Sequence, residues 1–140
     1  MLGATYAFSK EHFNYIEGLK GLKDWGFVEA MLTLKTWMMG GNIYRIHNIA
    51  VGHCYRKSFP YKFSTDSTIW NEKYMIELFI DNPEIKQKFY EHFKSRFSSK
   101  TKKQIEEIIF SADEFVSVKE KFIRTFDDYL LTFPECTESS

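Results

Sequence analysis

The sequence predicts a mixed fold, between α/β and α+β, with a few strands on the N-terminal side and a predominantly helical C-terminal region. Two short segments, residues 4–8 and 43–51, are rich in the β-branched or aromatic residues that favour strands. Beyond residue 67 the apolar residues recur every three to four positions instead. That spacing is typical of helices that bury one face.

The elements before residue 43 can be placed individually. A strand is expected over residues 4–8, and Ser9 is a suitable N-cap for a short helix that ends near Ile16. Residues 27–39 carry apolar side chains at helical spacing. The glycine pair at 40–41 should end this helix, because glycine tolerates the left-handed conformation of a C-cap.

Four further helices are expected toward the C-terminus. Residues 67–80 are apolar nearly all round, which predicts a buried helix, and residues 85–97 carry a single apolar stripe. A shorter helix is expected over 101–110. A capping box at 111–114 should start one last helix that continues through Tyr129. Its apolar stripe comprises Phe115, Val118, Phe122, Phe126 and Tyr129.

Composition excludes several classes of function. The 140 residues fit one domain, and 44% apolar with 18% aromatic residues can fill a core. Nineteen basic and nineteen acidic residues cancel, which argues against electrostatic capture of nucleic acid or anionic membrane. No run approaches the ~20 apolar residues of a membrane span. Cys54 and Cys136 are too few for a disulfide framework or a zinc site and are interpreted as free thiols.

Three short motifs follow one another between Trp25 and Tyr61: Trp25-Gly26, Trp37 with Gly40-Gly41, and Val51-Gly52-His53 with Arg56-Lys57 and Pro60-Tyr61. In this order and spacing they resemble the WGGEN and VGHxxRK motifs of GT-A-type glycosyltransferases, those of family 2 and, most closely, the polypeptide N-acetylgalactosaminyltransferases. The resemblance implies that residues 1–61 are the C-terminal part of a GT-A core and that 62–140 are a helical extension. The family's N-terminal half, with an acidic DxH or DxD motif, has no counterpart in this sequence.

The match to the VGHxxRK motif implies a loop that binds a metal and a diphosphate. By resemblance, His53 is a ligand of a divalent metal, Mn²⁺, which the chain could hold only with the missing half. Arg56, Lys57 and Tyr61 match residues of the loop that closes over the nucleotide in the family, where cationic groups stabilise a leaving diphosphate. On the residues alone, His53 is a single histidine after a strand and Arg56-Lys57 is an exposed basic turn.

The first motif is less complete. Trp25 and Gly26 match the block that lines the family's sugar pocket, but Val28 replaces its glutamate and cannot accept a hydrogen bond from a hydroxyl group. Glu29, one position later, matches the catalytic base of inverting relatives. Glu29 also fits a structural role, since a carboxylate in the first turn of a helix is stabilised by the macrodipole. Both interpretations of Glu29 stay open.

The resemblance therefore implies part of a glycosyltransferase that moves a sugar from a UDP donor to a protein or glycan hydroxyl group. The expected partners are a nucleotide-sugar, the acceptor, and either a complementary chain or a second copy bound through an exposed sheet edge. The alternative is a non-catalytic binding or structural module derived from a glycosyltransferase, which the loss of the glutamate at Val28 favours. The eukaryotic family would place the chain in the lumen of the secretory pathway, and any other origin in the cytoplasm.

Overall fold

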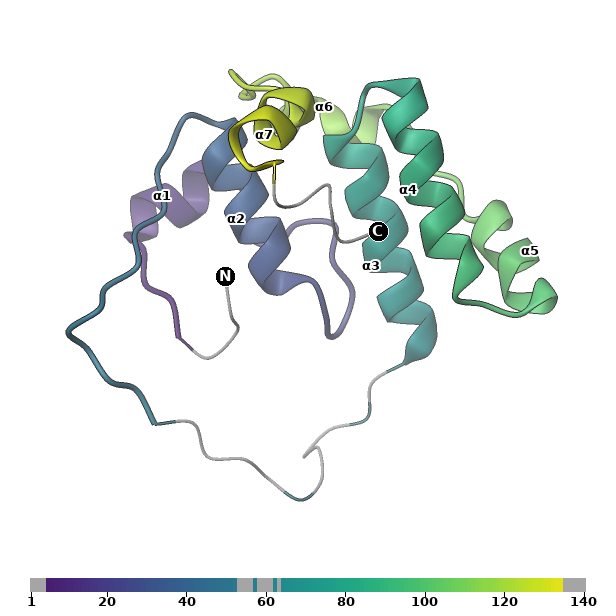
Figure 1. The fold of residues 1–140 in the computed structure, drawn as a ribbon, viewed down its shortest axis with the longest axis horizontal. Helices are drawn as coiled ribbons and strands as arrows, with labels where there is room; N and C mark the ends of the chain where they lie inside the picture. Colours follow the sequence, from purple (N-terminus) through teal and green to yellow (C-terminus); the bar gives the residue numbers. More distant parts are fainter. Residues whose placement is uncertain (1–4, 53–56, 58–61, 63, 135–140) are drawn as a thin grey trace.

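The computed structural model describes residues 5–52, 57, 62 and 64–134, within which the secondary structure is entirely helical. The described helices are α1 (Lys10–Tyr15), α2 (Val28–Met38), α3 (Thr65–Phe79), α4 (Pro83–Ser95), α5 (Ser99–Glu107), α6 (Asp113–Lys119) and α7 (Phe126–Thr132). α4 and α5 pack on α3, while α1 lies at the opposite end of the molecule (Figure 1). Residues 42–52, which follow the end of α2, run past α1 and away from the other helices (Figure 1).

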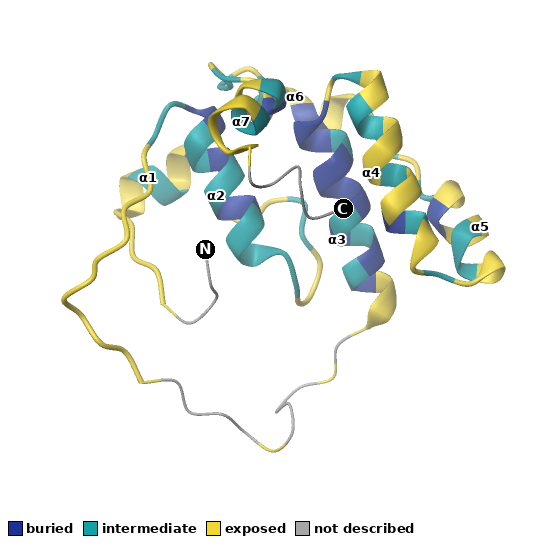
Figure 2. Cartoon of the chain, in the orientation of Figure 1, coloured by how far each residue is buried: buried dark blue, intermediate teal, exposed yellow. Residues whose placement is uncertain are grey.

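The hydrophobic core is centred on α2 and α3, which carry most of the buried positions (Figure 2). α3 buries nine of its fifteen residues, which confirms the prediction of a buried helix over 67–80. Tyr74, Leu78 and Phe79 on α3 are each at most 2% exposed. The other helices each add only one or two buried residues to this core, and α1 adds none.

The predicted ends of the first two helices are confirmed. The Ser9 hydroxyl accepts a hydrogen bond from the backbone N–H of His12 at 3.1 Å, as an N-cap does. At the end of α2, Gly40 adopts the left-handed conformation with φ of +85°. The N–H of Gly41 then donates to the carbonyl of Thr36 at 2.8 Å, which closes the helix end.

Both predicted strands are wrong for the residues that the structure describes. Residues 5–8 and 43–51 belong to no strand, and every residue from 42 to 52 is exposed. The hydrogen bonds of a strand lie between segments, so a β-prone sequence forms no strand without a second one beside it. No described segment lies alongside either of them as a strand. The described part of the chain therefore does not show the α/β part of the predicted fold class, and only the helical C-terminal region is confirmed.

The prediction of one continuous last helix is also wrong, because the chain breaks between α6 and α7. The N–H groups of Ile123 and Arg124 both donate to the carbonyl of Met38, at 2.8 and 3.1 Å. They satisfy an acceptor that the end of α2 leaves open, at the expense of helical bonds. Thr125 then starts α7 through a capping box with Asp128. α5 is likewise shorter than the predicted 101–110 at its C-terminal end.

Candidate functional site

The first motif forms a strained turn between α1 and α2. We call residues 21–27, which include Trp25 and Gly26, the Trp25 turn. Asp24 has φ of +45°, Gly26 of +106° and Phe27 of +65°. Gly21 lies in the same region, with φ of +95°. Residues that carry a side chain rarely adopt a positive φ, so a turn that contains two of them, Asp24 and Phe27, needs outside support.

That support comes from one face of α3. The fully buried side-chain amide of Asn71 accepts a hydrogen bond from the N–H of Lys23 at 2.7 Å. Its nitrogen faces the carbonyl oxygens of Lys23, Trp25 and Gly26 at 2.8, 3.3 and 3.2 Å. Ser67, four positions earlier on the helix, donates to the Asp24 carboxylate at 2.6 Å. Positions 67 and 71 face the same side of a helix, so α3 holds the turn with a single face.

Trp70, which lies between Ser67 and Asn71 on α3, holds the start of the Trp25 turn. Its indole N–H donates to the carbonyl of Gly21 at 3.1 Å, and the Lys23 ammonium lies 3.2 Å from the centre of its ring. A hollow of about 440 Å³ adjoins this ring and is also lined by Asp66, Gln104 and Glu107. Because Lys23 already covers one ring face, Trp70 is a core residue here rather than a platform for a sugar. Trp37 also packs against the core, so the structural interpretation of both tryptophans is confirmed.

The predicted site residues Trp25, Gly26 and Glu29 lie close together around this turn. The Trp25 side chain is 44% exposed, while its carbonyl points to Asn71. Glu29 is half-buried in the first turn of α2, and its carboxylate makes no hydrogen bond or ion pair within the described residues. The N-terminus of α2 has no side-chain cap either. A carboxylate at this place is compatible with both interpretations of Glu29, as a base or as a partner of the helix dipole.

The segment that matches the VGHxxRK motif, with Pro60 and Tyr61 after it, falls mainly outside the described residues. His53, Arg56 and Tyr61 all lie outside them, so their predicted roles stay predictions. Lys57 is described and exposed, and it shares no hydrogen bond or ion pair with the Trp25 turn. Within the part of the chain that the structure describes, no cluster of three or more His, Cys, Asp or Glu side chains could hold a metal ion.

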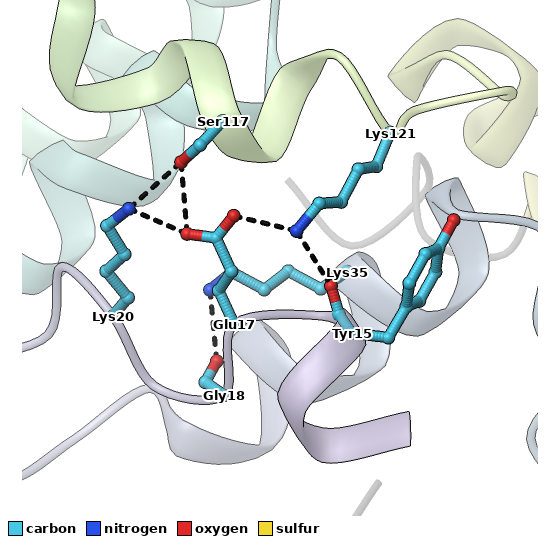
Figure 3. A network of polar contacts seen from close by, with 7 residues as sticks. All are labelled: Tyr15, Glu17, Gly18, Lys20, Lys35, Ser117 and Lys121. Carbon is cyan, nitrogen blue, oxygen red and sulfur yellow. Dashed lines mark hydrogen bonds and ion pairs between the residues drawn. The ribbon is translucent and has the colours of Figure 1, made fainter. Parts of the chain in front are cut away.

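A separate polar network holds the segment after α1 against α6 (Figure 3). Glu17 pairs with Lys20 at 2.7 Å and with Lys121 at 2.8 Å, and it accepts a hydrogen bond from Ser117 at 3.0 Å. The hydrogen bonds from Lys121 and Lys20 lower the pKa of Glu17 from 4.5 to about 2. This network is structural, since every charge in it is satisfied by a neighbour.

A buried lysine lies beside this network. The ammonium of Lys35 on α2 is fully buried and donates to the carbonyl of Gly18 at 3.0 Å (Figure 3). Burial lowers the pKa of Lys35 from 10.5 to about 8. Sequence reasoning missed this residue and Asn71. The only signal was a polar residue within an otherwise apolar stretch, which by itself does not identify its partner.

Comparison with curated proteins gives one consistent family. Polypeptide N-acetylgalactosaminyltransferase 5 of Rattus norvegicus is 33% identical over 96 residues, which is 66% of this chain and 10% of that protein. Polypeptide N-acetylgalactosaminyltransferase 16 of Homo sapiens is 32% identical over 93 residues, 64% of this chain and 16% of that protein. Polypeptide N-acetylgalactosaminyltransferase 10 of Homo sapiens is 35% identical over 83 residues, which is 58% of this chain and 14% of that protein.

These matches confirm the resemblance predicted from the sequence motifs. They cover only 10 to 16% of the length of these three relatives. No protein-family model matches the chain. No solved structure matches it either, so the GT-A fold stays a prediction. Among the described helices, none is both long and apolar enough to cross a membrane.

Proposed function

We propose, from the similarity of this chain to the polypeptide N-acetylgalactosaminyltransferases, that it forms part of a glycosyltransferase that moves a sugar from a UDP-sugar to a hydroxyl group of a protein or glycan. The observation that carries the proposal is the agreement between that similarity and the VGHCYRK sequence at residues 51–57. Histidine at position 53 and arginine at position 56 both stand at the matching places of that motif.

Sugar transfer requires a cationic group that stabilises the leaving diphosphate and a base that accepts a proton from the acceptor. The bond between the anomeric carbon and the donor phosphate breaks, and the diphosphate leaves with the electron pair. Cationic side chains stabilise that charge, and we assign this role to Arg56, with Lys57 and Tyr61 in the same loop. The oxygen of the acceptor hydroxyl group forms the new bond to the anomeric carbon and loses its proton, and Glu29, which follows Trp25 and Gly26 in the sequence, is the candidate base.

A divalent metal fits this chain only in part. His53 offers one imidazole, a donor type that suits Mn²⁺. Bound metals usually have three or more protein donors, and the described residues offer no such cluster. We therefore propose His53 as a ligand only together with donors from outside this chain, and residues 1–61 as the part of the catalytic core that carries it.

The test uses the full-length polypeptide or complex that contains this chain, with release of UDP from UDP-N-acetylgalactosamine as the readout. His53→Ala should reduce transfer sharply and weaken its dependence on Mn²⁺. Arg56→Ala should lower turnover by about ten- to a thousandfold, the range for removal of one stabiliser of transition-state charge.

Matched controls come from the same segment. His47→Ala and Arg45→Ala remove an exposed histidine and an exposed arginine that we assign to no site, and both variants should keep the wild-type rate. If His53→Ala and Arg56→Ala also keep that rate and the Mn²⁺ titration, the site assignment is wrong. Val28 in place of the motif glutamate favours the second candidate, a non-catalytic module, and a complex that binds UDP-sugar without transferring it would support that candidate.

A further inference from the structure

We propose that Asn71 is a positioning residue that sets the Trp25 turn and, through it, the first turn of α2 with Glu29. The inference that the turn is part of a site rests on the proposed function. The inference that Asn71 sets the turn rests on the geometry alone. Asn71 is fully buried, and its side-chain amide makes its hydrogen bonds to the backbone of the turn.

The chemistry of a primary amide fits the turn. It presents an acceptor and two N–H donors on one rigid group. The acceptor takes the N–H of Lys23, and the donors face three carbonyl oxygens of the turn. A carboxylate at this position would repel those carbonyls, and an apolar side chain would remove the hydrogen bonds to the turn altogether.

The turn transmits its conformation directly to α2. Phe27, the last residue of the turn, has φ of +65°, and its carbonyl accepts the first helical hydrogen bond from Met31 at 2.9 Å. Glu29 follows two residues after Phe27. A strained backbone of this kind persists only where its surroundings fix it, so loss of Asn71 should release both the turn and the start of α2.

Lys73 on the same helix supplies a matched control. It is also buried, and its ammonium donates to a backbone carbonyl, that of Ile105, at 2.7 Å. That bond holds the end of α5 and does not involve the Trp25 turn. Lys73→Met therefore removes a buried hydrogen bond from α3 without touching the turn, and Asn71→Leu removes those that hold the turn.

The first experiment is amide hydrogen exchange of the 140-residue chain by NMR. In Asn71→Leu, the Lys23 amide should exchange about ten- to a hundredfold faster relative to the core amide of Leu78, as expected for one lost buried hydrogen bond. In Lys73→Met this ratio should stay at the wild-type value. An unchanged ratio in Asn71→Leu, or an equal rise in Lys73→Met, would overturn the proposal.

The second experiment measures transfer by the full-length polypeptide or complex. Asn71→Leu and Asn71→Asp should lower kcat by about ten- to a hundredfold at an unchanged KM for the nucleotide-sugar, since misplacement of Glu29 affects the acceptor side. Each variant is assayed at the same number of degrees below its own melting temperature, and under this condition Lys73→Met should keep the wild-type kcat. If the wild type transfers and Asn71→Leu transfers equally well, Asn71 positions nothing in the site. If the wild type does not transfer at all, the proposed function fails, and hydrogen exchange still decides whether Asn71 sets the turn.

Discussion

α3 and residues 42–52, which precede it in the chain, are both rich in apolar residues, yet α3 is largely buried and residues 42–52 are exposed. α3 buries nine of its fifteen residues. Residues 42–52 are all exposed, including Ile46 at 62% and Tyr44 at 81% (Figure 2). A helix satisfies its own backbone and needs only a surface to pack against, whereas a strand needs a partner for its backbone as well. Apolar content therefore predicts burial only where the backbone can be satisfied locally.

The two regions also differ in what they carry. α3 supplies the side chains that fix the Trp25 turn, so its polar residues act through structure. The exposed segment leads directly into the VGHCYRK sequence, which is the strongest signal of chemistry in this chain.

The largest effect should come from a core aromatic residue. Phe126 is 7% exposed, and its ring packs against Phe89 and Tyr129. Phe126→Ala should lower the free energy of unfolding by about 3–5 kcal/mol, as measured by urea denaturation. Ile46→Ala, in the exposed segment, should change it by less than about 0.5 kcal/mol. A loss above about 1 kcal/mol for Ile46→Ala would show that this segment packs against the helices in solution.

Glycine substitutions should show the same contrast in the backbone. Gly21 has φ of +95°, and a Cβ added there would overlap the Tyr74 ring. Gly21→Ala should therefore cost about 2–4 kcal/mol from backbone strain and overpacking. Gly52 has open space around it, and Gly52→Ala should stay within about 0.5 kcal/mol. Equal melting temperatures for the two variants would contradict the close packing of the Trp25 turn on α3.

A smaller effect should follow from the Glu17 network. Its ion pairs lower the pKa of Glu17 to about 2, so the unfolded chain binds a proton at higher pH than the folded chain does. The contribution of Glu17 is therefore fully present above about pH 4.5 and is lost as the pH falls toward 2. Glu17→Gln should cost about 1–3 kcal/mol at pH 7 and flatten the loss of stability over that range. Urea denaturation at several pH values measures both, and an unchanged acid profile would exclude the ion pairs as its cause.

Much of the helical structure could be predicted because its signals are local. Ser9 as N-cap, the glycine end of α2 and the buried α3 all depend on residues within a few positions of each other. The candidate residues Trp25, Gly26 and Glu29 could be named from a motif in the same way. Asn71 could not, since its partners lie 45 to 48 positions away in the sequence.

The sequence by itself determined the period of each helix, most helix ends and the resemblance to the polypeptide N-acetylgalactosaminyltransferases, because each depends on the order of neighbouring residues. Only the tertiary structure decided the break between α6 and α7, where the backbone N–H groups of Ile123 and Arg124 donate to the carbonyl of Met38 instead of to a helical carbonyl. It also decided the absence of a strand over 43–51 and the attachment of the Trp25 turn to α3. Each of these outcomes depends on which backbone groups find partners from distant segments, and no local pattern contains that information.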